Sequence, residues 1–310
     1  MIENMDNIIK NISLKWMLVG LSMTTVATAL HAQATDKESF AIKAGAGIGL
    51  GNTMAANKNM AALSQKTGSG DYGIDFGWTF WKKGSNRLEG NIGLNYTPVS
   101  TTFTLEGLNY QYSATADADM DGNAYTRFYE LGEMRQKVLT GYFTIPIYVR
   151  YAYMVAKEIG LYADLGFRPG FKTSSKISSM SGTSYSYGVY PEYDDLMIDA
   201  DYINDFGETN LSDASCMKPE ANGFSMSMLI GIGAEFRIYG PLAADIGLRY
   251  DAGLTNLYKP EWNGDDNFVQ ANAPVNYLVD KGQEVRSFTG FLKSSHLSQF
   301  SVRIALVYRF

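Results

Sequence analysis

Strict alternation of apolar and polar residues is the feature that most constrains the fold of this chain. Its clearest run closes the sequence, where one face of an extended strand would carry Phe300, Val302, Ile304, Leu306, Tyr308 and Phe310. Side chains repeat with a period of two in a β-strand, so this run predicts a strand with one apolar face. The same period predicts seven further strands, over about 40–50, 72–80, 88–98, 139–151, 161–172, 224–238 and 242–254.

The charges in these eight spans all fall on the face opposite the apolar residues. They are Lys43, Asp75, Glu89, Arg150, Asp164, Arg168, Lys172, Glu235, Arg237, Asp245, Arg249, Asp251, Arg303 and Arg309. An Arg or Lys that faces the middle of a bilayer costs roughly 2 to 4 kcal/mol, so this segregation is typical of strands whose apolar face meets lipid. A soluble β-sandwich or lipocalin-like barrel is the alternative, because such folds also alternate, with their apolar residues inside.

The connections between the spans alternate in length, and this favours the membrane barrel. The spans that end near 50, 98, 172 and 254 are followed by stretches of about 20, 35, 50 and 40 residues, whereas those that end near 80, 151 and 238 are followed by short turns. Outer-membrane barrels have short periplasmic turns, long extracellular loops and an even number of strands. Aromatic residues at the short-turn ends fit an interfacial girdle; they are Trp81, Tyr153, Tyr239, Tyr308 and Phe310. The predicted fold is therefore all-β, an antiparallel transmembrane β-barrel of eight strands.

The first residues have the pattern of a secretory signal. Lys10 and Lys15 precede an apolar run, and the small-residue stretch Ala32-Gln33-Ala34 follows it. We predict a signal peptide over 1–32, cleaved near Ala32 or Ala34, and an outer-membrane β-barrel over 33–310. A retained transmembrane helix is the alternative, but an apolar run of about 15 residues is shorter than the roughly 20 that a span needs.

Cysteine content and net charge limit the remaining function classes. The single cysteine, Cys216, excludes an internal disulfide. The formal net charge of −6 disfavours nucleic acid as a partner.

Three passages carry a resemblance to a known group of proteins. They are Ala44-Gly45-Ala46-Gly47-Ile48-Gly49-Leu50, Phe143-Thr144-Ile145-Pro146-Ile147-Tyr148-Val149-Arg150-Tyr151 and Val302-Arg303-Ile304-Ala305-Leu306-Val307-Tyr308-Arg309-Phe310. With them the chain resembles the outer-membrane β-barrel families of Bacteroidota, including PorT-like proteins, and more distantly the OmpA/OmpX type of small barrel. The resemblance implies a location in the bacterial outer membrane and recognition of Phe310 by the barrel-assembly machinery. Members of these families serve in secretion, adhesion or envelope structure, so the resemblance selects no single role.

A pore and a lipid hydrolase are two further functions to weigh against the sequence. An eight-stranded barrel is just wide enough for side chains to fill, and the inward set of eight cations and six anions favours paired charges over a pore. His296 and Ser298 would share a strand face, with a spacing similar to that of outer-membrane lipid A deacylases. No Asp or Glu follows Glu284 to orient the histidine, so we predict no catalytic residues and no enzyme activity.

One motif in the second long connection suits a metal ion. Asp117-Ala118-Asp119-Met120-Asp121-Gly122-Asn123 places alternate carboxylates before a glycine, as in the start of an EF-hand loop. The twelfth position of an EF-hand loop is a glutamate, whereas here it is Phe128, and Glu130 lies two residues further along the chain. We predict Ca²⁺ ligation by Asp117, Asp119 and Asp121, with an acidic, solvated loop tip as the alternative.

The third long connection is acidic and rich in tyrosine. Its acids are Glu192, Asp194, Asp195, Asp199, Asp201, Asp205, Glu208, Asp213 and Glu220, and its tyrosines include Tyr185, Tyr187, Tyr190, Tyr193 and Tyr202. Carboxylates could gather the divalent cations that bridge lipopolysaccharide, and exposed aromatic hydroxyls suit protein or glycan recognition. These tyrosines equally suit hairpins that extend the barrel above the membrane. The expected function is a structural or binding role at the cell surface, with a secretion component, a small pore and a lipid hydrolase as alternatives.

Overall fold

The computed structural model describes most of the chain after residue 39. The described residues are 40–58, 63–105, 108–110, 117–118, 123–193, 196–198, 207–210, 215–216, 218–259, 279–280, 284–285 and 287–310. The signal peptide predicted over 1–32 lies outside them. Within these ranges, no helix is both long and apolar enough to cross a membrane.

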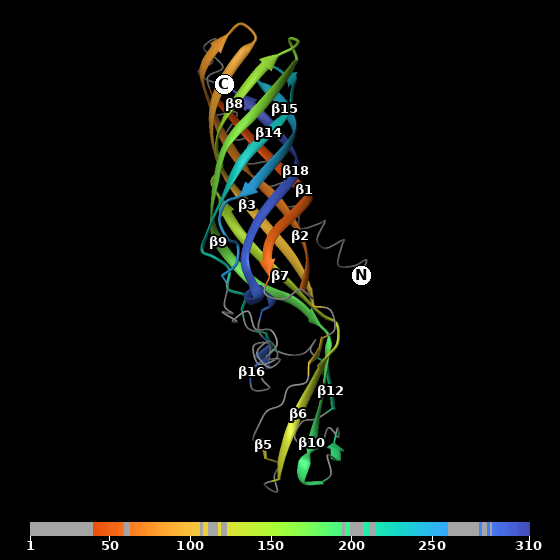
Figure 1. The fold of residues 1–310 in the computed structure, drawn as a ribbon. Helices are drawn as coiled ribbons and strands as arrows, with labels where there is room; N and C mark the ends of the chain where they lie inside the picture. The colour runs from red at the N-terminus through yellow and green to blue at the C-terminus, as the bar shows by residue number, and fades with distance from the viewer. Residues whose placement is uncertain are drawn as a thin grey trace.

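Long antiparallel strands close into a ring (Figure 1). They are β1 (Phe40–Lys58), β2 (Leu63–Lys83), β3 (Asn86–Leu105), β7 (Met134–Thr144), β8 (Ile147–Met154), β9 (Ile159–Ser181), β14 (Phe224–Tyr239), β15 (Leu242–Gly253) and β18 (Leu292–Arg309). Because β7 and β8 both pair with β3 and with β9, they are two halves of one strand, and the ring has eight members. Pairing of β1 with β18 closes the ring and confirms the predicted fold.

The one interruption in the ring falls at Ile145 and Pro146. Proline has no N–H and cannot donate to a sheet ladder, so the strand breaks there. Its neighbours keep the wall closed, because the Gly93 N–H donates to the Pro146 carbonyl at 2.8 Å and the Ile145 N–H donates to the Pro169 carbonyl at 2.8 Å. The predicted strand over 139–151 is therefore two paired segments.

The connections at one end of the ring are short, as predicted. Gly84 and Gly240 lie in two of these turns with φ of 58° and 53°, in the left-handed region that tight hairpin turns require. The third joins β8 to β9 through residues 155–158. We call this the short-turn end of the barrel and the opposite one the long-loop end.

The strands run much further toward the long-loop end than predicted. β9 has 23 residues, whereas a membrane-spanning strand needs about 9 to 11. Its exposed apolar side chains extend from Ile159 to Phe171. At about 3.3 Å per residue and a tilt of about 45°, that run spans roughly 28 Å, close to the height of a lipid-facing band. The remaining ten or so residues of β9 are mostly serine and other polar types, so the wall continues beyond the bilayer.

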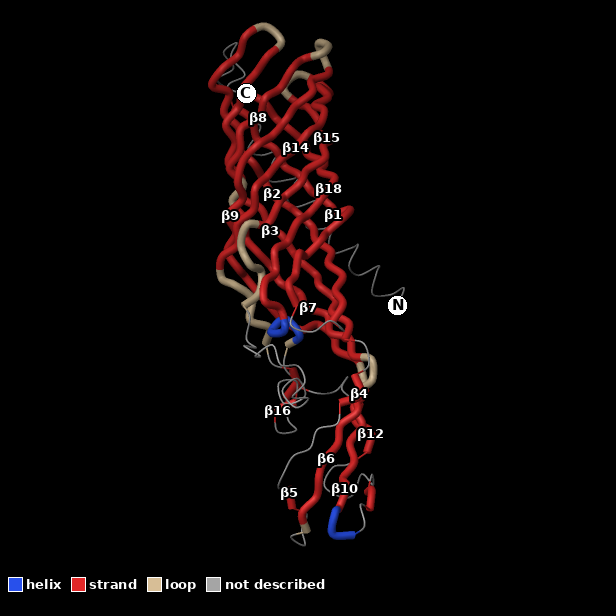
Figure 2. The backbone as a smooth tube through the Cα atoms, in the orientation of Figure 1, coloured by secondary structure: helices blue, strands red, loops and turns tan. Residues whose placement is uncertain are grey.

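A second sheet lies beyond the long-loop end (Figure 2). It comprises β4 (Leu108–Tyr110), β5 (Asp117–Ala118), β6 (Ala124–Leu131), β10 (Thr183–Tyr190), β11 (Leu196–Ile198) and β12 (Gly207–Asn210). Short strands β13 (Ser215–Cys216), β16 (Val279–Asp280) and β17 (Glu284–Val285) form a third sheet. Two 3-10 helices, η2 (Pro191–Tyr193) and η4 (Phe288–Phe291), complete the described elements.

Candidate functional site

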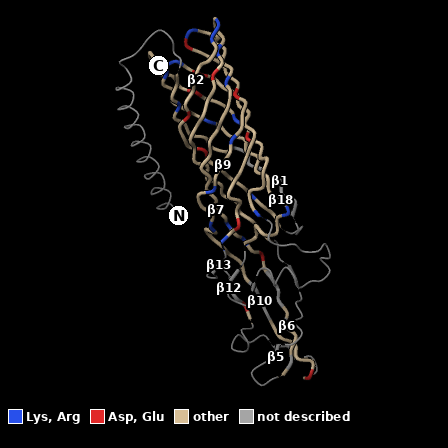
Figure 3. The backbone as a smooth tube through the Cα atoms, turned by 90° about the vertical axis from the view of Figure 1, so that its left-hand side faces the viewer, with Lys and Arg blue, Asp and Glu red and all other residues tan. Residues whose placement is uncertain are grey.

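Charged side chains fill the interior of the ring. Lys and Arg as well as Asp and Glu are distributed along the barrel strands (Figure 3). Seven cations form ion pairs with seven carboxylates inside the described part of the barrel; they are Lys43, Arg87, Arg150, Arg168, Arg249, Arg303 and Arg309 with Asp71, Asp75, Glu89, Asp164, Glu235, Asp245 and Asp251. Charge balance and mutual pairing offset the cost of removing these ions from water.

Glu89 and Glu235 organise the network at the short-turn end. Glu89 accepts from Lys43 at 2.9 Å and from Arg309 at 2.6 Å, and it forms an ion pair with Arg87 at 2.6 Å. Glu235 pairs with Arg87 at 2.9 Å and also with Arg309. Each carboxylate therefore bridges at least two cations that come from different strands.

Arg150 and Asp75 organise the middle of the network. Arg150 donates to both oxygens of Asp164, at 2.7 and 2.9 Å, and pairs with Asp245. Its guanidinium lies 3.6 Å from the centre of the Tyr162 ring, within range for cation–π attraction. Asp75 accepts from Arg303 at 2.7 Å and from the Tyr148 hydroxyl at 2.9 Å.

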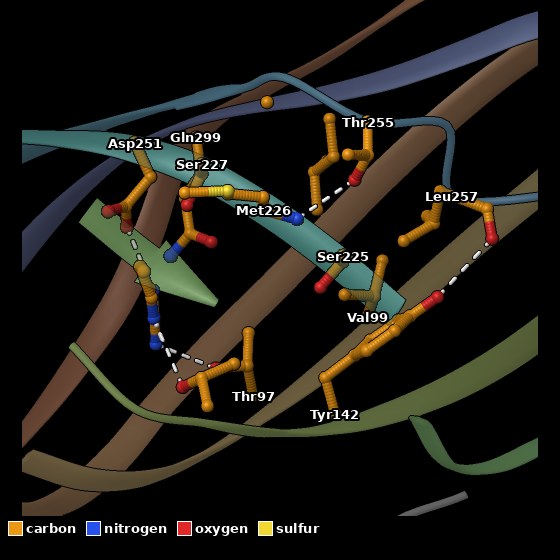
Figure 4. A pocket seen from close by; sticks show the side chains of 14 residues that line it. Thr97, Val99, Tyr142, Ser225, Met226, Ser227, Asp251, Thr255, Leu257 and Gln299 are labelled. Carbon is orange, nitrogen blue, oxygen red and sulfur yellow. Dashed lines mark hydrogen bonds and ion pairs between the residues drawn. The ribbon is translucent and has the colours of Figure 1, made fainter. Parts of the chain in front are cut away.

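Arg168 and Arg249 share two carboxylates nearer the long-loop end. Asp251 accepts from Arg168 at 2.9 Å and from Arg249 at 3.1 Å, and Asp71 pairs with both arginines. Arg168 also donates to the Thr97 hydroxyl at 2.7 Å (Figure 4). The network thus runs through the height of the lipid-facing band.

Sequence reasoning located most of this network. The predicted inward positions are confirmed as inward, but Lys172 is exposed, with its amine donating to the Ala221 carbonyl at 2.7 Å, and Arg237 is half-buried. Asp71 and Arg87 were missed, because the first lies one residue before a predicted span and the second was assigned to a turn. If the alternation of inward and outward residues is extended by one residue before each of these two spans, both charges are predicted to face inward.

Residues from the long connections close the mouth of the barrel at the long-loop end. We call residues 256–258 and 287–291 the mouth plug. Tyr258, Phe288 and Phe291 have at most 1% of their surface exposed. Tyr258 packs edge-on against Phe103 of the opposite wall, with ring centres 6.1 Å apart. The Phe288 N–H donates to the Gln136 amide oxygen at 2.8 Å, which fixes η4 inside the mouth.

A small cavity separates the mouth plug from the ion-pair network (Figure 4). Its volume is about 50 Å³, room for a few water molecules. Tyr142 lies at the edge next to the mouth plug, where its hydroxyl donates to the carbonyls of Asn222 and Leu257, both at 3.2 Å. Arg168 and Asp251 line the opposite side. Two filled layers, one apolar and one ionic, therefore occupy the lumen.

The closed eight-membered ring and its segregated faces agree with the comparison with known families. The family model described as "Outer membrane protein beta-barrel domain" matches residues 31–259. The chain belongs to this family. It is thus a bacterial outer-membrane β-barrel, which confirms the predicted location.

Solved structures of other outer-membrane proteins align with most of this barrel at low identity. Ail, the attachment invasion locus protein of Yersinia pestis, is 7% identical, with 88% of this chain and 100% of that chain covered and a TM-score of 0.30. OprG from Pseudomonas aeruginosa is 8% identical, with 88% and 96% covered and a TM-score of 0.35. The outer membrane protease OmpT from Escherichia coli is 10% identical, with 88% and 94% covered and a TM-score of 0.32. No curated protein matches the chain.

His296 and Ser298 lie on one face of β18 in this outer-membrane barrel, but on its outer face. They pair with Ala55 and Thr53 of β1, whereas Ser295 and Gln299, which flank them in the sequence, are buried inward. The His296 Nδ1 atom is buried and has no hydrogen-bond partner among the described residues. The structure brings the two side chains to the same face, and no carboxylate of the described residues orients His296 there.

The calcium ligands predicted for the second long connection fall largely outside the described residues. Asp119 and Asp121 lie in undescribed positions, and of Asp117 only the backbone is described, paired with Tyr125 at the end of β6. Among the residues that are described, no cluster of three or more His, Cys, Asp or Glu could hold a metal. Calcium ligation by these three aspartates stays a prediction.

The tyrosines of the third long connection build the second sheet of this family member. Tyr187 of β10 stacks on Phe128 of β6, with ring centres 5.1 Å apart and planes within 10°. Tyr185 lies 5.9 Å from Tyr187 on the same face. On the other face Tyr190 packs on Tyr125 at 5.3 Å. Tyr202 lies outside the described residues.

Proposed function

We propose that this outer-membrane barrel is a closed scaffold that presents a binding surface at the long-loop end, outside the cell. The observation that supports this most directly is the second sheet, which extends beyond a wall that itself outruns the bilayer (Figures 1 and 2). An anchor alone needs strands of only about 9 to 11 residues. The additional length raises the second sheet well above the lipid surface, where it can reach ligands.

The contents of the lumen argue against transport through the barrel. A permeation path is typically lined by one sign of charge or by ordered carbonyls, whereas here seven cations are paired with seven carboxylates in the described lumen. The mouth plug adds an apolar layer above them. Both features favour a role for the surface over a role for the interior.

The second sheet has the composition of a recognition surface. Tyr185, Tyr187 and Phe128 form a row on one face, and the exposed Glu208 lies opposite Tyr185 in the pairing register. Connections 106–133 and 182–223 together hold 15 Asp and Glu against two basic residues, Arg127 and Lys218. Aromatic rings with neighbouring carboxylates suit a protein or glycan ligand, and the carboxylates suit divalent cations that bridge lipopolysaccharide.

Replacing the second sheet tests this function. In the variant, residues 108–131 and 183–210 are each replaced by a short Gly-Ser link, and the barrel is expected to keep its heat-modifiable gel mobility. Binding of the purified protein to glycan arrays and to immobilised extracellular proteins should be lost in the variant, and should fall in the native protein on addition of EDTA if Asp117, Asp119 and Asp121 hold calcium. Equal binding by the native protein and the variant would contradict the proposal.

The finer family assignment offers a second candidate role. The passage Phe143–Tyr151, which supports the resemblance to PorT-like proteins of Bacteroidota, spans the break between β7 and β8. A PorT-like role would make the barrel an envelope component of protein secretion. Co-purification with other envelope proteins after mild detergent extraction, abolished by the second-sheet replacement, would favour this role over ligand capture from outside.

A further inference from the structure

A second cavity lies inside the ion-pair network itself. Its volume is about 20 Å³, and its charged lining consists of Lys43, Arg150, Arg249, Arg303, Asp164 and Asp245. One water-sized sphere needs about 10 to 15 Å³. The cavity therefore has room for a single water molecule or monatomic ion, and it excludes phosphate, sulfate and organic solutes.

Two of the lining arginines keep donors that no group in the described barrel uses. Arg303 donates to Asp75 through Nη1, and its Nε and Nη2 have no partner. Arg249 pairs with Asp251 and Asp71 through Nε and Nη1, and its Nη2 has no partner. These three nitrogens carry five N–H groups. Leaving buried charged donors unpaired is costly, so a partner is expected.

The register places these two arginines beside each other. Arg303 of β18 lies opposite Gly247 of β15, so Arg249 is its diagonal neighbour on the same inward face. Gly247 leaves room for the Tyr162 ring, because a Cβ there would lie 2.3 Å from the Tyr162 hydroxyl and 2.9 Å from the Ile232 carbonyl oxygen. The Tyr162 ring and the two like-charged arginines line the cavity together.

We propose that this cavity binds one small monovalent anion of the halide class, such as chloride. The unpaired acceptors nearby are Asp245 Oδ1 in the lining and Asp75 Oδ1 next to Arg303, two oxygens against five N–H groups within the described network. A water molecule could donate to these two oxygens but accepts only two hydrogen bonds, which leaves three of the five N–H groups without a partner. A halide accepts several hydrogen bonds, donates none and pairs with both guanidinium groups. This site goes beyond the proposed function and does not depend on any surface ligand.

Bromide replaces chloride in such a site and is located by its anomalous scattering. The full-length mature protein would be refolded from urea into detergent with bromide as the sole halide and crystallised. We expect an anomalous difference peak in the cavity, in contact with Arg249 and Arg303. Density there without an anomalous signal would identify water and overturn the proposal.

Thermal stability gives a second, independent readout. The melting temperature of the native barrel should be higher in chloride than in gluconate at equal ionic strength, because a ligand that binds only the folded state stabilises it. Arg303→Gln should abolish that difference, whereas Arg237→Gln, at the half-buried rim, should keep it. Identical melting temperatures of the native barrel in the two salts would overturn the proposal; if Arg303→Gln does not fold, the bromide experiment on the native protein decides.

Discussion

Glu89 illustrates at the residue scale how the lumen is held together. It is fully buried and forms ion pairs with Lys43, Arg87 and Arg309, which come from β1, β3 itself and β18. In a low-dielectric interior such a carboxylate stabilises the fold mainly because, without it, Lys43 would lose its ion pair and Arg87 and Arg309 would share Glu235 alone. The same reasoning applies to Asp71 and Asp251, which are shared between Arg168 and Arg249.

Glu89→Gln is therefore expected to destabilise the barrel by about 3 to 5 kcal/mol, the cost of leaving buried charges uncompensated. Urea unfolding in detergent micelles, followed by heat-modifiable gel mobility, measures this free energy. Glu133→Gln is the matched control, because Glu133 pairs with Arg135 on the surface with half of its side chain exposed, and such a pair contributes at most about 1 kcal/mol. Similar losses in the two variants would contradict the assigned role of the network.

At the element scale, the mouth plug depends on aromatic residues held by the upper walls. Tyr258 is buried against Phe103, and its hydroxyl lies 3.5 Å from the hydroxyls of Thr101 and Thr140. Burial raises the pKa of the Tyr258 phenol above its ordinary value of 10.0. The folded state therefore binds this proton more tightly than the unfolded state does.

Alkaline pH should consequently loosen the plug. Because the folded pKa of Tyr258 is raised, its contribution to stability is fully present below pH 10.0 and is lost as the pH rises through the folded pKa. Tyr258→Phe should remove that part of the alkaline decline in unfolding free energy while keeping most of the packing. Parallel curves for the native protein and Tyr258→Phe between neutral and strongly alkaline pH would show that Tyr258 does not titrate in this way.

The last strand supplies a further element-scale prediction, about assembly. Phe310 pairs with Phe40 through both backbone groups, at 3.0 and 3.1 Å, and its ring stacks on that of Phe40 at 6.2 Å. If the assembly machinery reads the Phe310 ring, Phe310→Ala should lower the amount of folded protein in the outer membrane of cells severalfold, and Phe40→Ala should not. Refolding into detergent should be similar for both variants. If both variants lose the same amount of folded protein in cells, the lost contact between the two rings, and not recognition of Phe310, causes the effect.

At the scale of the whole molecule, the sequence could predict the part of the fold that meets lipid. Every strand that contacts lipid must alternate apolar outward residues with polar inward residues. This pattern predicts the eight spans, the short turns and most of the inward charges. Beyond Phe171 the wall faces water outside, serines occupy both faces of β9, and the alternation disappears. For this reason the sequence predicts connections in places where the strands of the wall in fact continue.

The mouth plug was hidden for a related reason, and the sequence predicts the second sheet only as one alternative, hairpins that extend the barrel above the membrane. Phe288 and Phe291 lie in a connection with no repeating pattern, and only the fold shows that they enter the lumen beside Gln136. Tyr187 and Phe128 meet through a pairing between two different long connections, a contact that neither connection reveals alone. Asp245 and Arg150 were both predicted to face inward, but their pairing depends on the curvature of the closed ring.

Single-channel recording in planar bilayers tests the central claim, a barrel closed by its own side chains, most directly. The purified, heat-modifiable native protein should insert without producing conductance steps, because the ion-pair network and the mouth plug both occupy the lumen. The variant without the second sheet should likewise produce no conductance steps. Stable conductance steps from the native protein, proportional to the amount inserted, would contradict a closed scaffold. They would favour transport through the interior of the barrel as the function.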